Sequence, residues 1–234
     1  AKFRLGQYDE AITHLKIYID LRKSLGNCAL IEAILCWWQG AAYFKRRQFS
    51  LAFDWFQASD SKLDEEIQTT HIIVDSPLVE VGRRIGNLGV VFLCCGDLDK
   101  AREHLFKSLK KFTEFSKNNQ HPDVASVHYN LGLLHLRCGE VQETKASFCK
   151  AVAISKATPN SPLSQKLAQV LELCELSVPQ TELCARVDLM LQLGEIEPQM
   201  FEPEVQIIMN RHYLQASTIL PFVPKGKGII IFSV

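Results

Sequence analysis

The chain has 234 residues, of which 26 are basic and 26 acidic, so its formal net charge is zero. A balanced charge gives no general attraction to nucleic acid or to an anionic membrane surface. No apolar run approaches the roughly 20 residues that span a bilayer. We therefore expect neither a nucleic-acid partner nor membrane insertion.

The N-terminal half of the chain reads as a succession of helices. Residues 1–6 resemble the tail of a truncated first helix, which predicts that the natural protein extends further toward its N-terminus. A helix is expected over about 9–24, followed by a hairpin of helices over about 29–46 and 49–66. A third hairpin spans about 77–117, since Ser76-Pro77 supplies a capping side chain and then a proline at the first helical position.

The C-terminal half begins with a fourth hairpin over about 121–157 and a further helix from Pro162 to about Leu176. An amphipathic helix is expected over 180–193 because Leu183, Val187 and Met190 would share one face. Residues 204–217 are predicted to form one more helix. The last residues, 218–234, are predicted to be an irregular or disordered tail.

Four segments of the chain repeat one pattern. Each is centred on a small residue near the start of its second helix: Ala11, Ala52, Ala101 and Thr144. Twelve residues earlier the complete copies have Gly40, Gly89 and Gly132; five residues earlier come Gly6, Arg47, Gly96 and Gly139; four residues later come Leu15, Phe56, Leu105 and Phe148. Small residues let two antiparallel helices approach, large ones fill the remaining space, and the turn glycine closes the first helix in a left-handed conformation.

This pattern resembles the tetratricopeptide repeat (TPR) over roughly residues 1–157. The repeats are about 42 residues long rather than about 34, which is similar to kinesin light chain and related adaptors. Gln39 stands where two other copies have leucine, and Thr144 stands where three have alanine, so both sites are expected to pack less tightly.

The resemblance implies an all-α fold, a right-handed superhelical solenoid of stacked antiparallel helix pairs. Residues 1–178 would form the TPR array with its truncated first repeat, 179–217 the C-terminal capping helices, and 218–234 the tail. Covering helices are expected because the end of a solenoid exposes an apolar face.

In a TPR stack the first helices of successive hairpins line a concave groove. The predicted peptide contacts are Trp38, Lys45, Arg83, Asn87, Tyr129, Asn130 and Arg137. Asn87 and Asn130 occupy the same slot, two residues before the glycine, and an amide that both donates and accepts can hold an extended peptide by its backbone. The alternative is that these amides bridge helices or meet water. Trp38 rather than Trp37 is expected to face the groove.

The groove positions include basic residues and no acidic one, which favours an acidic or mixed acidic and aromatic peptide; ordinary solvated charge is the alternative. No Gly-rich phosphate loop, Gly-x-Ser-x-Gly or His-Glu-x-x-His motif occurs. Eight cysteines include no Cys-x-x-Cys pair, and His135 falls in a ring-packing slot rather than a ligand pattern. We expect no catalysis, no metal and no cofactor, and we interpret the cysteines as buried free thiols of a cytoplasmic protein.

These observations predict an adaptor or scaffold that binds a linear, acidic segment of a protein partner in the groove. Two alternatives stay open: a constitutive subunit of a cytoskeletal or ciliary assembly, which binds through its convex face and tail, and a regulatory domain of a larger, enzyme-containing protein. The oligomeric state is left open by the sequence.

Overall fold

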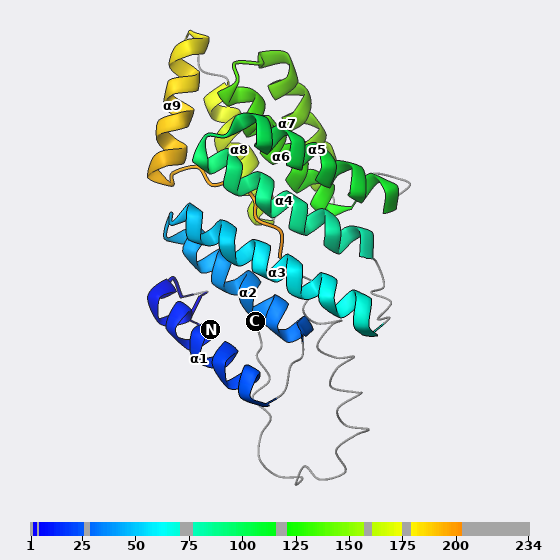
Figure 1. The fold of residues 1–234 in the computed structure, drawn as a ribbon. Coiled ribbons are helices and arrows are strands. Elements are labelled where there is room, and N and C mark those ends of the chain that lie inside the picture. Colours follow the sequence, from blue (N-terminus) through cyan, green and yellow to red (C-terminus); the bar gives the residue numbers. More distant parts are fainter. Residues whose placement is uncertain are drawn as a thin grey trace. The chain divides into compact units, whose positions relative to one another are not determined.

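The computed structural model describes residues 2–3, 5–25, 29–70, 77–115, 121–156, 161–174 and 179–202. In these ranges every regular element is an α-helix, which confirms the predicted all-α class (Figure 1). In chain order the helices are α1 (Tyr8–Leu25), α2 (Ala29–Lys45), α3 (Phe49–Thr70), α4 (Pro77–Cys95), α5 (Leu98–Phe115), α6 (Pro122–Arg137), α7 (Val141–Ser155), α8 (Pro162–Cys174) and α9 (Gln180–Leu193). The helix predicted at 204–217 and the tail at 218–234 lie outside the described residues.

The chain divides into two compact units, and each is described by itself. The helices α1 to α3 belong to the first unit; α4 to α9 and the segment that follows α9 belong to the second. Within the second unit α4 packs on α5, α5 on α6, α6 on α7 and α7 on α8; α4 also contacts α6, and α9 packs on α6. The right-handed superhelix remains a prediction, as do the proposed domain boundaries.

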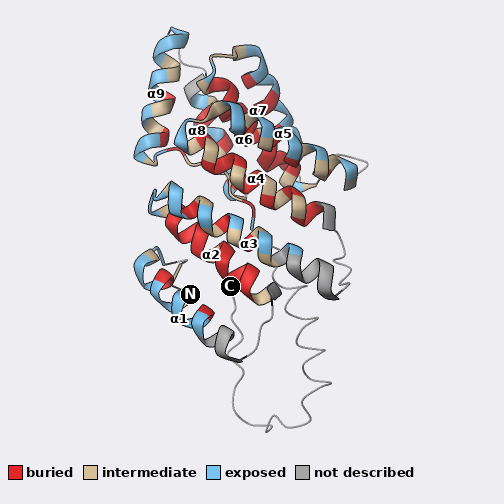
Figure 2. Cartoon of the chain, viewed as in Figure 1, coloured by how far each residue is buried: buried red, intermediate tan, exposed pale blue. Residues whose placement is uncertain are grey.

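The helix pairs pack as the repeat pattern predicts. Each early glycine of a first helix lies against the bulky residue of the second helix: Gly40 against Phe56, Gly89 against Leu105 and Gly132 against Phe148. A Cβ added at Gly132 would lie 2.4 Å from a ring carbon of Phe148, and one at Gly40 would lie 2.8 Å from Phe56. Buried residues line these facing surfaces (Figure 2). The absence of a side chain at each of these glycines therefore sets how closely the two helices approach.

The turn slot of the repeat requires a left-handed backbone. Gly6, Gly96 and Gly139 have φ of 73°, 85° and 75°, and Arg47, which fills the same slot in the remaining copy, has φ of 60°. Such values cost a residue with a Cβ roughly 1–2 kcal/mol. The slot thus keeps its geometry even where glycine is replaced.

The two departures from the repeat pattern have different outcomes. Thr144 is buried, and its hydroxyl donates to the Glu140 carbonyl at 2.7 Å, so its polar atom is satisfied. Gln39 is fully buried, and neither atom of its amide is hydrogen-bonded within the part of the chain that the structure describes. A buried amide without partners costs free energy.

Replacing Gln39 by leucine is therefore expected to raise the free energy of unfolding by about 1–2 kcal/mol, since it removes the desolvation cost of the amide. Urea denaturation of the two proteins measures the change. The matched control is Gln39→Ala, which removes the amide but leaves a cavity, and is expected to be less stable than the leucine variant. Lower stability of Gln39→Leu than of wild type would show that the amide contributes to the fold.

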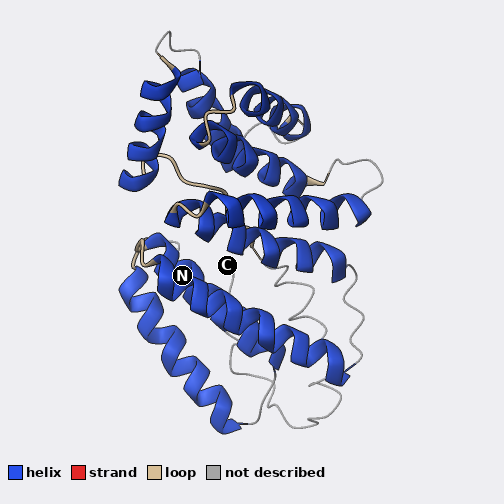
Figure 3. Ribbon diagram, turned by 45° about the horizontal axis from the view of Figure 1, so that its top comes forward, coloured by secondary structure: helices blue, strands red, loops and turns tan. Residues whose placement is uncertain are grey.

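The second unit ends in an extended segment rather than a helix. Gly194, with φ of 79°, caps α9. Residues 195–202 then run back past α6 to α4 without regular secondary structure, as the loop that leaves α9 in Figure 3 shows. Ile196 and Phe201 in this segment are each 1% exposed. The segment is thus part of the core of the unit.

Candidate peptide-binding groove

The predicted site residues fall in both units. Trp38 and Lys45 lie on α2 of the first unit, where the half-buried Trp38 contacts Phe3 and Trp37 at ring-centroid distances of 5.1 and 4.9 Å. Trp37 is 5% exposed. The more accessible indole is thus Trp38, and its place in the groove stays a prediction. The other predicted residues lie on α4 and α6, which are neighbours in the second unit.

Asn87 on α4 and Asn130 on α6 each hold one residue of the extended segment by its backbone. The Asn87 amide donates to the Phe201 carbonyl at 2.9 Å and accepts from the Phe201 N–H at 2.9 Å. Asn130 does the same to Gln199, at 2.9 Å to its carbonyl and 2.7 Å from its N–H. Both asparagines are at most 1% exposed. Donor and acceptor of each amide are therefore used on main-chain groups.

The spacing of the two held residues matches the geometry of an extended chain. Backbone groups of residues i and i+2 point to the same side of a strand, about 6.6 Å apart. Equivalent slots of consecutive repeats thus contact alternate residues, 199 and 201. We term the surface formed by Gly86, Asn87, Tyr129, Asn130 and Lys166 the amide groove.

Further contacts hold the part of the segment that precedes Gln199. The Tyr129 hydroxyl donates to the Glu197 carbonyl at 3.2 Å, and Gln169 on α8 donates to the Glu195 carbonyl at 3.0 Å. The Lys166 ammonium lies 3.0 Å from the Gln199 side-chain oxygen. Burial, and then the charge of Glu197, raise the pKa of the Tyr129 phenol, which stays a neutral donor.

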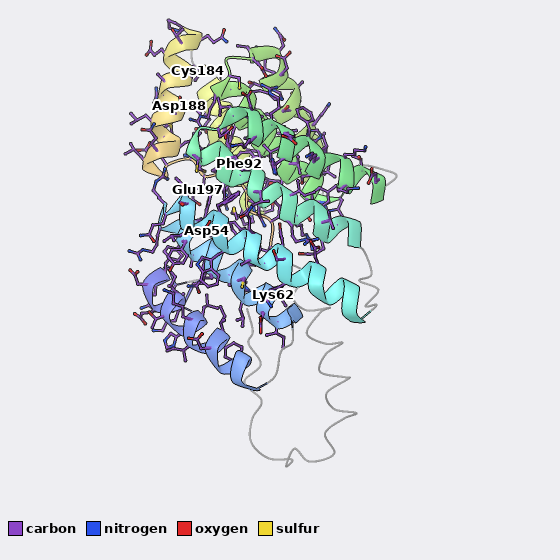
Figure 4. The ribbon with its side chains drawn as sticks, viewed as in Figure 1. Asp54, Lys62, Phe92, Cys184, Asp188 and Glu197 are labelled. Carbon is purple, nitrogen blue, oxygen red and sulfur yellow. The ribbon has the colours of Figure 1, made fainter. Side chains whose placement is uncertain are left out.

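The predicted arginines are engaged by carboxylates of the same chain. Arg83 lies 2.7 Å from Asp123 and 3.6 Å from Glu80. Arg137 pairs with Asp188 of α9, labelled in Figure 4, and donates to the Leu93 carbonyl. The expectation of a wall of one sign is therefore wrong for this unit. The acidic partners come from positions outside the groove slots: α4 itself, the start of α6, and α9.

The cysteines and histidines show no ligand cluster in the described part of the chain. Cys36 is buried, but Cys95, Cys138 and Cys149 are exposed free thiols, so the expectation of buried thiols is wrong for these three. Cys95 and Cys138 lie at helix ends, and Cys149 lies on the solvent-exposed face of α7. A leucine beside a cysteine in the sequence therefore does not ensure that the thiol is buried. His135 is buried, and its Nδ1 lies 2.5 Å from a Glu140 oxygen, so it has a core role as expected.

His128 on α6 provides a pH-dependent contribution to stability. Burial, and then the nearby charge of Lys150, lower the pKa of His128 to about 4 from an ordinary 6.5. The folded protein keeps this ring neutral while the unfolded chain takes up a proton. Stability that is present above pH 6.5 is therefore lost progressively as the pH falls toward 4.

We expect His128→Gln to reduce the loss of unfolding free energy between pH 7.5 and pH 4.5 by about 1 kcal/mol relative to wild type. Urea denaturation at the two pH values measures the loss in each protein. Because both proteins contain the same carboxylates, the carboxylate contribution drops out of the difference between the two losses. Equal losses in the two proteins would show that His128 does not stay neutral in the fold.

One part of the site was not foreseen from the sequence, namely its occupant. The prolines at Glu197-Pro198 and Glu202-Pro203 indicate only breaks after the helix at 180–193. The available signal is the combination of a capping glycine with a proline-containing stretch whose apolar residues, Ile196 and Phe201, have no helical period. Proline favours extended backbone in itself and in the residue before it.

Comparison with protein families gives a match over the helix pair that carries Tyr129 and Asn130. Residues 125–158 match the tetratricopeptide repeat. The matched range runs from α6 to just beyond α7, which is the predicted fourth hairpin. Comparison with curated proteins gives no match. No described helix is long and apolar enough to cross a membrane.

Proposed function

We propose that this chain is a protein-interaction module whose amide groove binds an extended segment of a partner protein. Tetratricopeptide repeats generally mediate interactions between proteins, and residues 125–158 match that repeat. The single observation that carries the proposal is the two-way hydrogen bonding of Asn87 and Asn130 to alternate backbone residues. We propose binding rather than catalysis, in an adaptor or scaffold of the cytoplasm.

The occupant seen in the groove indicates the class of ligand. Residues 195–202 contain three glutamates, Glu195, Glu197 and Glu202, and one aromatic residue, Phe201. The Lys166 ammonium hydrogen-bonds to this segment. An acidic and aromatic segment of a partner would have the same composition as this occupant, and we propose that class of ligand on composition alone, since Lys166 contacts the neutral Gln199 side chain and Arg83 and Arg137 are paired within the chain.

A partner of this kind would have to replace the chain's own segment. The local segment is effectively at high concentration because it is tethered to α9. A partner therefore binds the wild-type chain weakly unless its segment is longer or the tethered one is released. Competition between the two is a direct consequence of the shared site.

The test uses a fluorescein-labelled peptide with the sequence of residues 194–203 and three full-length proteins. These are wild type, an open variant carrying Gln199→Pro and Phe201→Ala, and the open variant with Asn87→Ala and Asn130→Ala added. In the open variant the tethered segment lacks one N–H and the buried ring. Fluorescence polarisation should show binding to the open variant at least about tenfold tighter than to wild type, and loss of that binding in the third protein.

A filled groove also supports the structural-subunit alternative, in which residues 195–202 close the repeat permanently. In that case the open variant, folded by circular dichroism, would bind the peptide no better than wild type does. Tight binding that persists without the two asparagines would instead place the ligand elsewhere on the chain. Either result excludes the amide groove as a ligand site.

A further inference from the structure

We infer that the amide groove selects its ligand by an aromatic side chain, which enters a pocket beneath Gly86 two residues after the residue held by Asn130. This inference rests on the proposed function and names the kind of segment that the site takes. The chain's own Phe201 shows the geometry.

Both main-chain polar groups of Phe201, the residue whose ring fills the pocket, are held by hydrogen bonds. Asn87 binds both the N–H and the carbonyl of Phe201. With both groups held, the direction of the side chain is set by the chirality of the residue. The side chain points between α4 and α5, where Phe201 is 1% exposed. A ligand residue bound by Asn87 would direct its side chain to the same place.

The pocket exists because α4 has a glycine at this point. A Cβ on Gly86 would lie 2.5 Å and 2.8 Å from two carbons of the Phe201 ring, and 2.9 Å from the Ser108 hydroxyl. Real Cβ atoms do not approach other atoms so closely, and the ring occupies space that any other residue at position 86 would fill. Gly86 is not one of the repeat's packing glycines, since that role belongs to Gly89.

The walls of the pocket suit an apolar ring. Phe112 of α5 lies 5.9 Å from Phe201 between ring centroids, tilted by 31°, and is itself backed by the stacked ring of His121. Ser108, which lies beside Gly86, donates its hydroxyl to the Gly82 carbonyl at 2.6 Å. The Ser108 hydroxyl is therefore hydrogen-bonded to another residue of the pocket wall. Aromatic rings at such tilted geometries attract one another beyond their buried area.

The specificity that follows has two parts. Positions equivalent to Gln199 and Phe201 are held by main-chain groups, which any residue except proline supplies. The position equivalent to Phe201 also needs a ring. The predicted ligand is thus an extended acidic segment in which an aromatic residue follows, two positions later, a residue other than proline.

The test is a set of labelled peptides of residues 194–203 that differ only at the Phe201 position, titrated into the full-length open variant. Peptides with phenylalanine, leucine and alanine at this position are compared. Phenylalanine should bind at least about tenfold more tightly than alanine, with leucine between them, in line with the apolar area that each buries. The peptide changes leave the folding of the protein untouched.

A second arm adds Gly86→Ala to the open variant, after circular dichroism has shown that the protein is folded. The added methyl should weaken the phenylalanine peptide by at least about tenfold and the alanine peptide little, so that the preference for the ring is largely lost. This coupling identifies Gly86 as part of the pocket wall.

The outcomes separate the inference from the proposed function. Equal affinities for all three peptides, or a ring preference that survives Gly86→Ala, would overturn the aromatic pocket while the groove remained a backbone-binding site. If none of the peptides binds the open variant, the proposed function fails and the pocket's specificity fails with it.

Discussion

Replacing both Asn87 and Asn130 by alanine is expected to release residues 197–202 and to make the Gln199 and Phe201 amide hydrogens exchange at least about 100-fold faster. The two amides supply four hydrogen bonds to this backbone. Their loss also leaves buried N–H and carbonyl groups without partners, each at a cost of about 1–3 kcal/mol. Native-state hydrogen exchange followed by NMR or mass spectrometry measures the change.

The matched control is Gln169→Ala, which removes a single contact to the Glu195 carbonyl at the exposed start of the segment. Its effect on exchange at Gln199 and Phe201 is expected to stay below about threefold, because the exposed carbonyl can bond to water instead. Unchanged exchange in the double asparagine variant would show that burial of Phe201, and not the amides, holds the segment.

Replacing Gly132 by alanine is expected to lower the free energy of unfolding by about 2 kcal/mol. Overpacking costs up to about 3 kcal/mol, and the higher helix propensity of alanine offsets about 1 kcal/mol of that cost. The added Cβ would lie 2.4, 2.6 and 2.8 Å from three carbons of the buried Phe148 ring. This ring lies in the middle of the α6 and α7 interface and contacts Tyr129, so it has little room to move. Denaturant midpoints measure the loss.

The compensating variant comes from the repeat itself. The preceding hairpin has Leu105 in the place of Phe148, and a Cβ on its glycine would lie 3.0 Å from the leucine. Phe148→Leu in the Gly132→Ala protein should therefore recover part of the lost stability. A Gly132→Ala protein more stable than wild type would mean that the helices of this pair are not held at closest approach.

The helix pairs could be predicted from the sequence because their determinants are local and recur. Gly132 and Phe148 lie in neighbouring helices of one hairpin, and the same offset joins Gly40 to Phe56 and Gly89 to Leu105. The left-handed turn at Gly139 is favoured because glycine adopts this conformation without steric cost. Each of these features depends on a few residues within one repeat, so the recurring pattern is enough to identify them.

The asparagine slots could also be predicted, but their occupant could not. Asn87 and Asn130 contact residues that lie 114 and 69 positions away in the sequence. No periodic signal joins a helix of one repeat to an extended segment beyond the last helix. The pairing of Arg137 could not be predicted for the same reason, because Asp188 comes from α9 and not from the repeat that carries the arginine.

The most direct measurement of the central claim is the NMR spectrum of the side-chain amides of Asn87 and Asn130 in the open variant during titration with the unlabelled peptide of residues 194–203. Both pairs of side-chain amide signals should shift together as the peptide saturates. In an isotope-labelled peptide, the amides equivalent to Gln199 and Phe201 should become protected while the one between them continues to exchange. A peptide that saturates the protein without moving either asparagine signal would contradict the account.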